Sequence, residues 1–144
     1  NLETRKLSRD DLSDGGSMVI FPSGCVSTKM KMSEEIAFDC EWKVFTSRLI
    51  KQSDATIVPI YFQGQNSQLF HLASRFGLLF RSALLFKEVR SRMGTDVPVT
   101  IGDPLNLRDF KENISNQELI KSLRTLTYSL DPNLPPDPPI GLEL

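Results

Sequence analysis

The sequence predicts an α/β fold in which a mostly parallel central sheet is flanked by helices. Three apolar segments rich in β-branched and aromatic residues, at 17–21, 55–62 and 96–102, predict buried strands. Segments with helical spacing of apolar residues alternate with them, as in an α/β layer. At 144 residues the chain is long enough for one domain with its own core.

The first half of the chain predicts a helix, a strand, a loop and a second helix. Residues 2–14 read as a surface helix, ended by a glycine pair that precedes the strand at 17–21. Residues 29–41 have no clear period and predict a long loop. At 42–53 the basic side chains lie on the face opposite the apolar ones, which predicts a helix packed on a sheet. The apolar residues of that helix are Trp42, Phe45, Leu49 and Ile50.

The second half begins with the strand at 55–62. Pro59 lies within it and has no N–H for the ladder, so the strand is either bulged at Pro59 or ends there. Residues 68–93 then predict two helices with a break near Gly77. The second of these is expected to turn one apolar side inward, made of Leu78, Leu85, Phe86, Val89 and Met93.

The last predicted helix, at 116–130, places leucines at near-helical spacing after the strand at 96–102. The tail at 131–144 holds five of the nine prolines and is expected to be extended or disordered. We therefore assign residues 1–130 to the domain and residues 131–144 to a separate tail.

Composition excludes some classes of function. A formal net charge of −1 argues against nucleic-acid binding, which needs a basic excess or stripe. Two cysteines, Cys25 and Cys40, are too few for a disulfide framework. We expect them to be free thiols in a reducing cytosol rather than a disulfide. His71 is the only histidine, which argues against a zinc site. The chain begins at Asn1 with what reads like mid-protein sequence, so we expect a fragment.

The stretch FPSGCVST, residues 21–28, is the first candidate site. A loop at the carboxyl end of a strand in an open α/β sheet is where ligands usually bind. Its small and hydroxyl-bearing residues could hold an oxyanion, or they could satisfy their own backbone in a tight turn. The spacing is not that of a P-loop. The candidate binding residues here are Phe21, Pro22, Ser23, Gly24, Cys25, Ser27 and Thr28.

The stretch VPIYFQGQNS, residues 58–67, is the second candidate site. It repeats the pattern of a proline near a strand end followed by a glycine turn and polar side chains. Asn66 is also a candidate N-cap for the next helix, and that interpretation is slightly favoured. The candidate substrate-binding residues are Pro59, Gly64, Asn66 and Ser67.

These two stretches and their spacing resemble the glycerolipid (lysophospholipid) acyltransferase superfamily. Its third block reads Phe-Pro-Glu-Gly-Thr-Arg-Ser, where this chain has residues 21–27, and its fourth is a strand centred on Val-Pro, matched by Val58 and Pro59. The GQNS turn and the segment VPVTIGDPL at 97–105 resemble a bacterial branch labelled haemolysin or ornithine-lipid-type acyltransferase. The resemblance covers roughly residues 15–128.

The resemblance implies transfer of a fatty acyl group from an acyl carrier protein or coenzyme A thioester to a lyso-lipid acceptor, with no bound cofactor or metal. Ser23 and Val26 replace the block's glutamate and arginine, which implies an acceptor head group other than phosphate. The family's catalytic histidine precedes an aspartate by five positions, and His71 has neither that partner nor that place in the chain. We therefore expect the catalytic pair upstream and read His71 as structural or on the surface.

Three further interpretations stay open. The chain could be a non-catalytic lipid- or partner-binding module on the same scaffold. It could be a thiol hydrolase using Cys25, although a bystander thiol is preferred. The basic, apolar helix at 78–92 could lie on an anionic membrane or pack into the core. The family resemblance favours a cytoplasmic protein with peripheral contact at the inner membrane.

Overall fold

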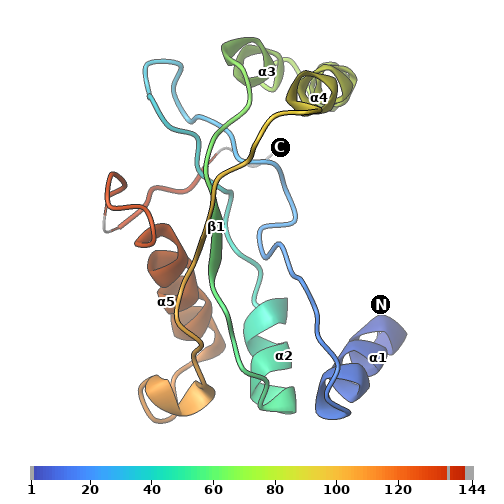
Figure 1. Cartoon of the computed structure of the whole chain (residues 1–144), viewed down its shortest axis with the longest axis vertical. Coiled ribbons are helices and arrows are strands. Elements are labelled where there is room, and N and C mark those ends of the chain that lie inside the picture. The colour runs from blue at the N-terminus through green and yellow to red at the C-terminus, as the bar shows by residue number, and fades with distance from the viewer. Residues whose placement is uncertain (1, 136, 142–144) are drawn as a thin grey trace.

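The computed structural model describes residues 2–135 and 137–141. A short sheet runs along the middle of an elongated molecule, with one group of helices at each end (Figure 1). The strands are β1 (Ile60–Phe62) and β2 (Val99–Ile101). The helices are α1 (Leu2–Ser13), α2 (Phe45–Ser53), α3 (Gln68–Ala73), α4 (Leu78–Arg92), the 3₁₀ turn η1 (Leu107–Asp109) and α5 (Asn116–Tyr128).

The sheet differs from the predicted one. It has two strands, and β1 pairs antiparallel with β2, with Ile60 opposite Ile101 and Phe62 opposite Val99. The α/β class is therefore right, but the mostly parallel central sheet was a wrong expectation. The apolar run at 17–21 forms no strand, and Val19 and Phe21 in it are exposed. An apolar run becomes a strand only where a neighbouring strand offers its N–H and C=O groups, and this run has no ladder to join.

Pro59 lies opposite a bulge, so the predicted bulge in the strand at 55–62 is not found. A bridge pairs Ile57 with Leu105, and the ladder resumes where Ile60 pairs with Ile101. Three positions separate Ile57 from Ile60 but four separate Ile101 from Leu105, so the extra residue lies on the partner segment, between Ile101 and Leu105. Pro59 contributes only its carbonyl, which accepts from Gly102 N–H at 2.9 Å.

The hydrophobic core lies between α2, α5 and the segment that enters β1. The N-terminus of α5 is fixed by a capping box, in which the Ser115 hydroxyl accepts from Glu118 N–H and the Glu118 carboxylate accepts from Ser115 N–H. The amphipathic pattern then directs the helix's apolar stripe inward. The buried members of this core are Trp42, Ile50, Ile114, Leu119, Ile120 and Leu123.

Helices α3 and α4 break at Gly77, as predicted, where φ is +117°. The side that α4 presents is not as predicted. Phe86, Val89 and Met93 are exposed, while Arg81 and Glu88 are buried. The Leu78 side chain lies outside the described residues. The helical period shows which apolar residues share a side of α4, but it does not show whether that side packs against the rest of the protein.

The proline-rich tail begins with a turn, in which Leu134 N–H donates to the Asp131 carbonyl at 3.1 Å, and its later described residues are hydrogen-bonded to the domain. The Arg124 guanidinium donates to the carbonyls of Pro138 and Pro139, each at 2.6 Å. Gly141 N–H donates to the Asp39 carbonyl at 2.7 Å. These bonds hold the tail beside the loop at 21–28. Residues 136 and 142–144 lie outside the described part of the chain.

Candidate functional site

The loop at 21–28 leaves the 17–21 segment in a tight turn. Gly24 N–H donates to the Phe21 carbonyl at 3.1 Å, and Gly24 has φ of +67°, a conformation that favours glycine. Pro22 accepts from Lys43 N–H at 2.9 Å, which ties the turn to the segment before α2. Phe21 is 71% exposed, and its ring centroid lies 6.4 Å from that of Phe62 on β1. The two candidate stretches therefore meet through these rings.

The hydroxyl groups of this loop face the protein. Ser23 is buried, and its hydroxyl donates to the Cys25 carbonyl at 3.1 Å. The Ser27 hydroxyl donates to the Asp39 carboxylate. Thr28 is buried, and its backbone forms a bridge with Phe38. This geometry is that of a turn that satisfies its own polar groups, so the groups it offers outward are the Phe21 ring and the Gly24 backbone.

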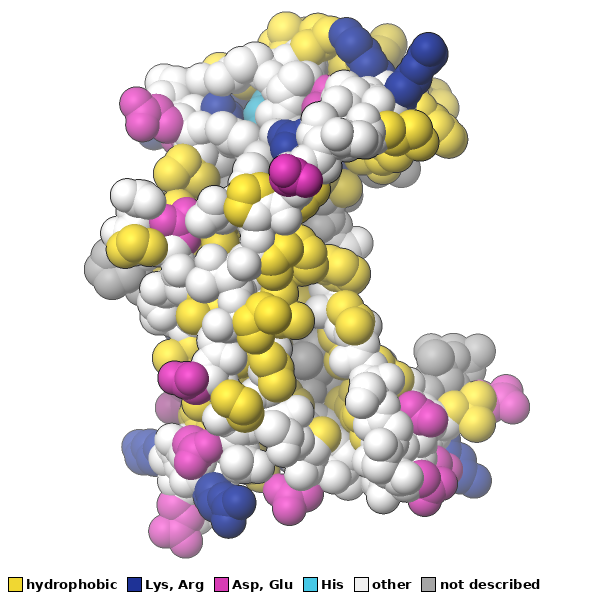
Figure 2. Space-filling model, viewed as in Figure 1, with side chains coloured by type: hydrophobic (Ala, Val, Ile, Leu, Met, Phe, Trp, Pro, Cys, Tyr) yellow, Lys and Arg dark blue, Asp and Glu magenta, His cyan; other side chains and the backbone are white. Residues whose placement is uncertain are grey.

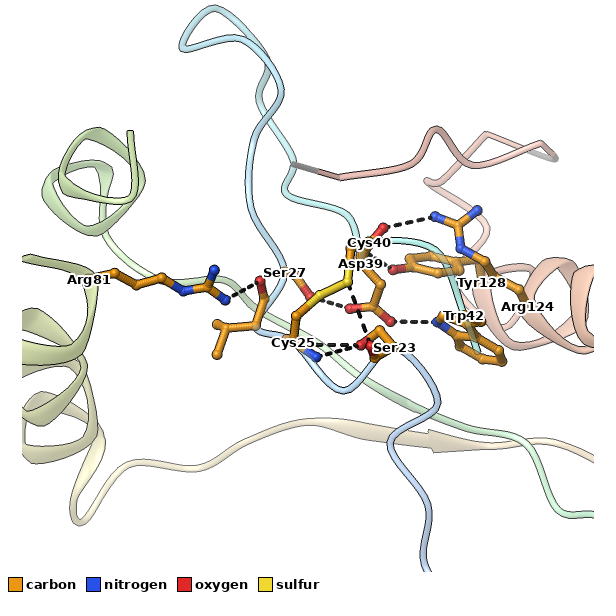
Figure 3. The surroundings of a disulfide bond; sticks show 10 residues. Ser23, Cys25, Ser27, Asp39, Cys40, Trp42, Arg81, Arg124 and Tyr128 are labelled. Atoms are coloured by element: carbon orange, nitrogen blue, oxygen red, sulfur yellow. Dashed lines mark hydrogen bonds between the residues drawn. A yellow bond between two sulfur atoms is a disulfide. The ribbon is translucent and has the colours of Figure 1, made fainter. Parts of the chain in front are cut away.

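Asp39 joins the loop to the rest of the domain, as Figure 3 shows. Its carboxylate accepts from Ser27 on one oxygen and from Trp42 Nε1, at 2.9 Å, on the other. Its N–H donates to the Tyr128 hydroxyl at 3.0 Å. Sequence reasoning missed Asp39, which stands in the aperiodic segment 29–41. The available signal was a carboxylate within the otherwise apolar run IAFDC, because an acid in such a place needs donors.

Cys25 and Cys40 form a disulfide, with their Cα atoms 6.6 Å apart (Figure 3). The expectation of free thiols is therefore corrected. Sequence spacing could not find the pair, because its geometry depends on how the loop at 21–28 folds back on the 37–40 segment. A sulfur in a disulfide is not a thiolate nucleophile, so this state also excludes Cys25 as the nucleophile of a hydrolase.

Tyr128 is buried, and its hydroxyl lies next to the backbone of Asp39. Burial, followed by the negative charge of Asp39, raises the pKa of Tyr128 to about 12. The Arg124 guanidinium lies 4.9 Å from the centre of the Tyr128 ring, in a cation–π arrangement. The phenol of Tyr128 is therefore neutral at physiological pH, and its oxygen accepts the hydrogen bond from Asp39 N–H that fixes the backbone there.

The second candidate stretch turns at Gly64, where φ is +107°. The side-chain amide of Gln65 then bonds both ways to the long loop, accepting from Ala37 N–H at 3.0 Å and donating to the Glu35 carbonyl at 2.7 Å. Pro59 is buried opposite the bulge. These contacts place the turn beside the 29–41 loop.

Ser67, one residue beyond the expected Asn66, is the N-cap of α3 and accepts from Phe70 N–H at 3.3 Å. Ser67 also donates to Glu88 from both its N–H and its hydroxyl. Burial alone would raise the pKa of Glu88, but these bonds and the nearby Arg92 and Lys87 bring it below its ordinary value. Asn66 instead lines a shallow cavity of about 290 Å³, together with Leu85, Glu88, Val89, Arg92 and Met93.

His71 is buried on α3, so the surface alternative does not hold. Burial lowers its pKa, and the positive charge of Lys29 lowers it further, while the Asn66 backbone and Glu88 act in the opposite direction. Neither imidazole nitrogen makes a hydrogen bond of normal geometry with the described residues, and the same holds for the buried Lys29 ammonium. A buried imidazole that is hydrogen-bonded to no acid lacks the access and the orientation that a base acting on a lipid hydroxyl needs.

The described residues contain no candidate metal site and no membrane-spanning helix. Across residues 2–135 and 137–141, no three His, Cys, Asp or Glu side chains gather as a metal site would require. None of the helices in the described part of the chain has the length and apolar character needed to span a bilayer.

Comparison with known proteins gives two distant relatives. The chain is 26% identical over 120 residues to the lyso-glycine lipid O-acyltransferase of Bacteroides thetaiotaomicron, covering 78% of this chain and 43% of that protein. A protein of the same name from Phocaeicola vulgatus is also 26% identical over 120 residues, covering 78% of this chain and 42% of its own length. No protein-family model and no solved structure matches.

The chain thus spans less than half the length of the curated relatives it matches. The similarity supports an acyltransferase family, and both relatives are named for acyl transfer to a lyso-lipid. Neither name carries the haemolysin label of the predicted bacterial branch.

Proposed function

We propose that this chain forms part of an acyltransferase that moves a fatty acyl group onto the hydroxyl of a lyso-lipid acceptor. The observation that carries the proposal is its similarity to two lyso-glycine lipid O-acyltransferases over 120 residues. The Phe-Pro-Ser-Gly loop and the Val-Pro segment, which resemble blocks of the glycerolipid acyltransferases, agree with it.

The reaction needs a thioester donor and a base. The acceptor oxygen attacks the thioester carbonyl, the new C–O bond forms, and the C–S bond breaks. The hydroxyl proton passes to the base and then to the leaving thiolate, so no covalent acyl-enzyme is needed. We assign the base to a His–Asp pair outside this chain, because His71 is buried. The donor is an acyl carrier protein or coenzyme A thioester.

We assign the loop at 21–28 to the acceptor site and the turn at 64–67 to the neighbouring wall. The loop's hydroxyls are engaged internally, so the contribution we assign to it is shape, through the exposed Phe21 ring and the Gly24 backbone. Val26 stands where the family's block has an arginine, and its carbonyl accepts from Arg81 at 3.1 Å. A loop without that outward cation suits an acceptor with an uncharged or amino-acid head group better than a phosphate.

The acceptor lipid lies in a bilayer, so the proposal includes peripheral contact with the inner membrane. The alternative is a non-catalytic lipid-binding module. The burial of His71, the chain's only histidine, is compatible with both, so the two differ in whether the complete protein supplies a base.

The test is an acyl-transfer assay on the complete reading frame that encodes this chain, with lyso-glycine lipid and either acyl carrier protein or coenzyme A thioesters. We expect transfer with at least one donor. Phe21→Ala should raise KM for the acceptor several-fold, while the equally exposed Val19, changed to Ala, should leave KM unchanged. Lipid binding without transfer by the complete protein would favour the non-catalytic module.

A further inference from the structure

Helix α4 buries two of its charged residues and exposes most of its large apolar ones. Arg81 and Glu88 are only 9% and 6% exposed, whereas Leu79, Phe86 and Met93 are 86%, 81% and 74% exposed. Leu79 and Phe86 lie seven residues apart, which is two helical turns, so they form an apolar line along the outward side of α4, and Met93 follows as the exposed C-cap residue. This is the reverse of a helix that covers a soluble core.

Two polar anchors hold α4 in this orientation. The Arg81 guanidinium donates to the Val26 carbonyl at 3.1 Å, and the Glu88 carboxylate accepts from Ser67 N–H at 2.9 Å as well as from its hydroxyl. Both bonds point from α4 into the protein. Rotating α4 to bury its apolar line would break them and leave two desolvated charges unpaired, which is costly.

The apolar line of α4 continues onto α3 and the connection between the helices. We call this surface the α3–α4 apolar face. Figure 2 shows the hydrophobic side chains gathered over this end of the molecule, with basic side chains at their edge. The exposed large hydrophobic residues of the face are Leu69, Leu72, Phe76, Leu79, Phe80, Phe86, Val89 and Met93.

Charge separates in the same way. Residues 68–93 contain five Lys or Arg and one Asp or Glu, for a net charge of +4. The other 118 residues carry a net charge of −5, which gives −1 for the whole chain. The one acid of the segment, Glu88, is buried and hydrogen-bonded, so it does not screen the surface. The exposed cations beside the apolar face are Arg75, Lys87, Arg90 and Arg92.

We propose that the α3–α4 apolar face docks on the surface of a bilayer that contains anionic phospholipids. The apolar line enters the boundary between head groups and acyl chains, and the four exposed cations meet lipid phosphates. A soluble partner would satisfy the apolar line, but the concentration of positive charge around it complements an anionic bilayer. The inference extends the proposed function, since the acceptor lipid lies in the same bilayer.

The test is co-sedimentation of the chain with sucrose-loaded vesicles, without any acyl donor. We expect partition onto vesicles of phosphatidylglycerol and phosphatidylcholine at least tenfold above pure phosphatidylcholine, and weaker binding in 0.5 M NaCl. Leu79→Glu with Phe86→Glu should lower partition at least tenfold. The matched control is Leu7→Glu, at a leucine on α1 that is 64% exposed and lies at the opposite end of the molecule (Figure 1).

The cations are tested separately. Lys87→Gln with Arg90→Gln should weaken binding to the anionic vesicles by on the order of twentyfold, about fivefold for each charge removed. Lys111→Gln with Lys121→Gln removes the same charge from exposed positions elsewhere and should have little effect beyond the change in net charge. Circular dichroism of each variant shows whether the helices are retained.

Three results would overturn the inference. One is equal binding to anionic and neutral vesicles, and another is equal loss in the α4 variants and their controls. The third is a dimer, seen by analytical ultracentrifugation, that Leu79→Glu with Phe86→Glu dissociates while no vesicles bind, which would assign the face to a second copy. Vesicle binding without acyl transfer by the complete protein would contradict the proposed function alone.

Discussion

The hydroxyl of Ser27 donates a hydrogen bond to the carboxylate of Asp39, twelve residues further along the chain. The second carboxylate oxygen accepts from Trp42 Nε1, so Asp39 connects the loop at 21–28 with the residues that lead into α2. The disulfide between Cys25 and Cys40 lies immediately beside this connection. The loop that resembles an acyltransferase block is therefore held to the 38–40 segment by a disulfide, by the Ser27–Asp39 hydrogen bond and by the backbone bridge between Thr28 and Phe38.

Replacing Asp39 with alanine should destabilise the domain by about 2–3 kcal/mol. Two donors, the Ser27 hydroxyl and the Trp42 indole, would lose their charged acceptor in a half-buried place. Denaturant unfolding followed by Trp42 fluorescence measures this change directly, because the chain has one tryptophan. Asp96→Ala, at an exposed position, is the control and should lie within about 0.5 kcal/mol of the wild type. Equal stability of the two variants would contradict the role of Asp39.

Reduction of the Cys25–Cys40 disulfide should lower the stability of the domain. A cross-link spanning 15 positions restricts the unfolded chain and contributes about 3 kcal/mol in the chain-entropy description. Thermal unfolding with and without a phosphine reductant should show a lower Tm when reduced. Cys25→Ser and Cys40→Ser should each reproduce that loss and abolish the response to reductant. A wild type whose Tm ignores the reductant, or whose thiols react freely in the folded state, would count against the disulfide.

Stability should fall at alkaline pH because of Tyr128. Its pKa is about 12 in the folded protein against an ordinary value of 10.0, so the unfolded chain loses the phenolic proton first. The stabilisation is complete below pH 10 and is lost as pH rises toward 12, by at most about 3 kcal/mol. Urea unfolding at pH 9 and pH 11.5 should show a smaller decrease in the free energy of unfolding for Tyr128→Phe than for the wild type. An equal decrease would mean that another group causes the loss of stability at alkaline pH.

Tyr61 provides the matched comparison for that experiment. Burial, then the charges of Asp131 and Asp39, also raises the pKa of Tyr61. Tyr61→Phe should therefore remove a further part of the alkaline drop. The ultraviolet absorbance of the two tyrosines at high pH reports their ionisation independently of unfolding.

His71 should titrate below its ordinary pKa of 6.5, because burial and the neighbouring Lys29 disfavour the imidazolium. A group with a lowered folded pKa adds stability above its unfolded pKa, and that stability is lost as pH falls through the folded value. NMR gives one imidazole signal to follow, since His71 is the only histidine. His71→Gln should remove the part of the stability change seen between pH 7 and 5. A His71 pKa above 6.5 would contradict the buried, neutral assignment.

Local patterns predicted most of the helices. Residues 2–14, 42–53 and 116–130 contain α1, α2 and α5, and Gly77 separates α3 from α4 as expected. These features follow from side-chain periodicity and from glycine's freedom at positive φ, which act over a few residues. The predicted bulge at Pro59 was not found, because the extra residue lies on the partner segment between Ile101 and Leu105.

Predictions that needed a distant partner failed. The segment at 17–21 has a strand's composition but no strand beside it, and the sheet is an antiparallel pair instead of a mostly parallel one. The Cys25–Cys40 bond depends in the same way on how two segments return to one another. Pairing is a property of two segments, and either one alone carries only half of the information.

The sequence by itself determined the α/β content, the breaks at glycine and proline, and the blocks that indicate an acyltransferase. Only the tertiary structure decided that Asp39, Cys40 and Tyr128 gather behind the loop at 21–28, and that the apolar line of α4 faces outward. A helical period fixes which residues share a face of α4. The direction of that face is fixed by the hydrogen bonds that Arg81 and Glu88 of α4 make to Val26 and Ser67, which lie on other segments of the chain.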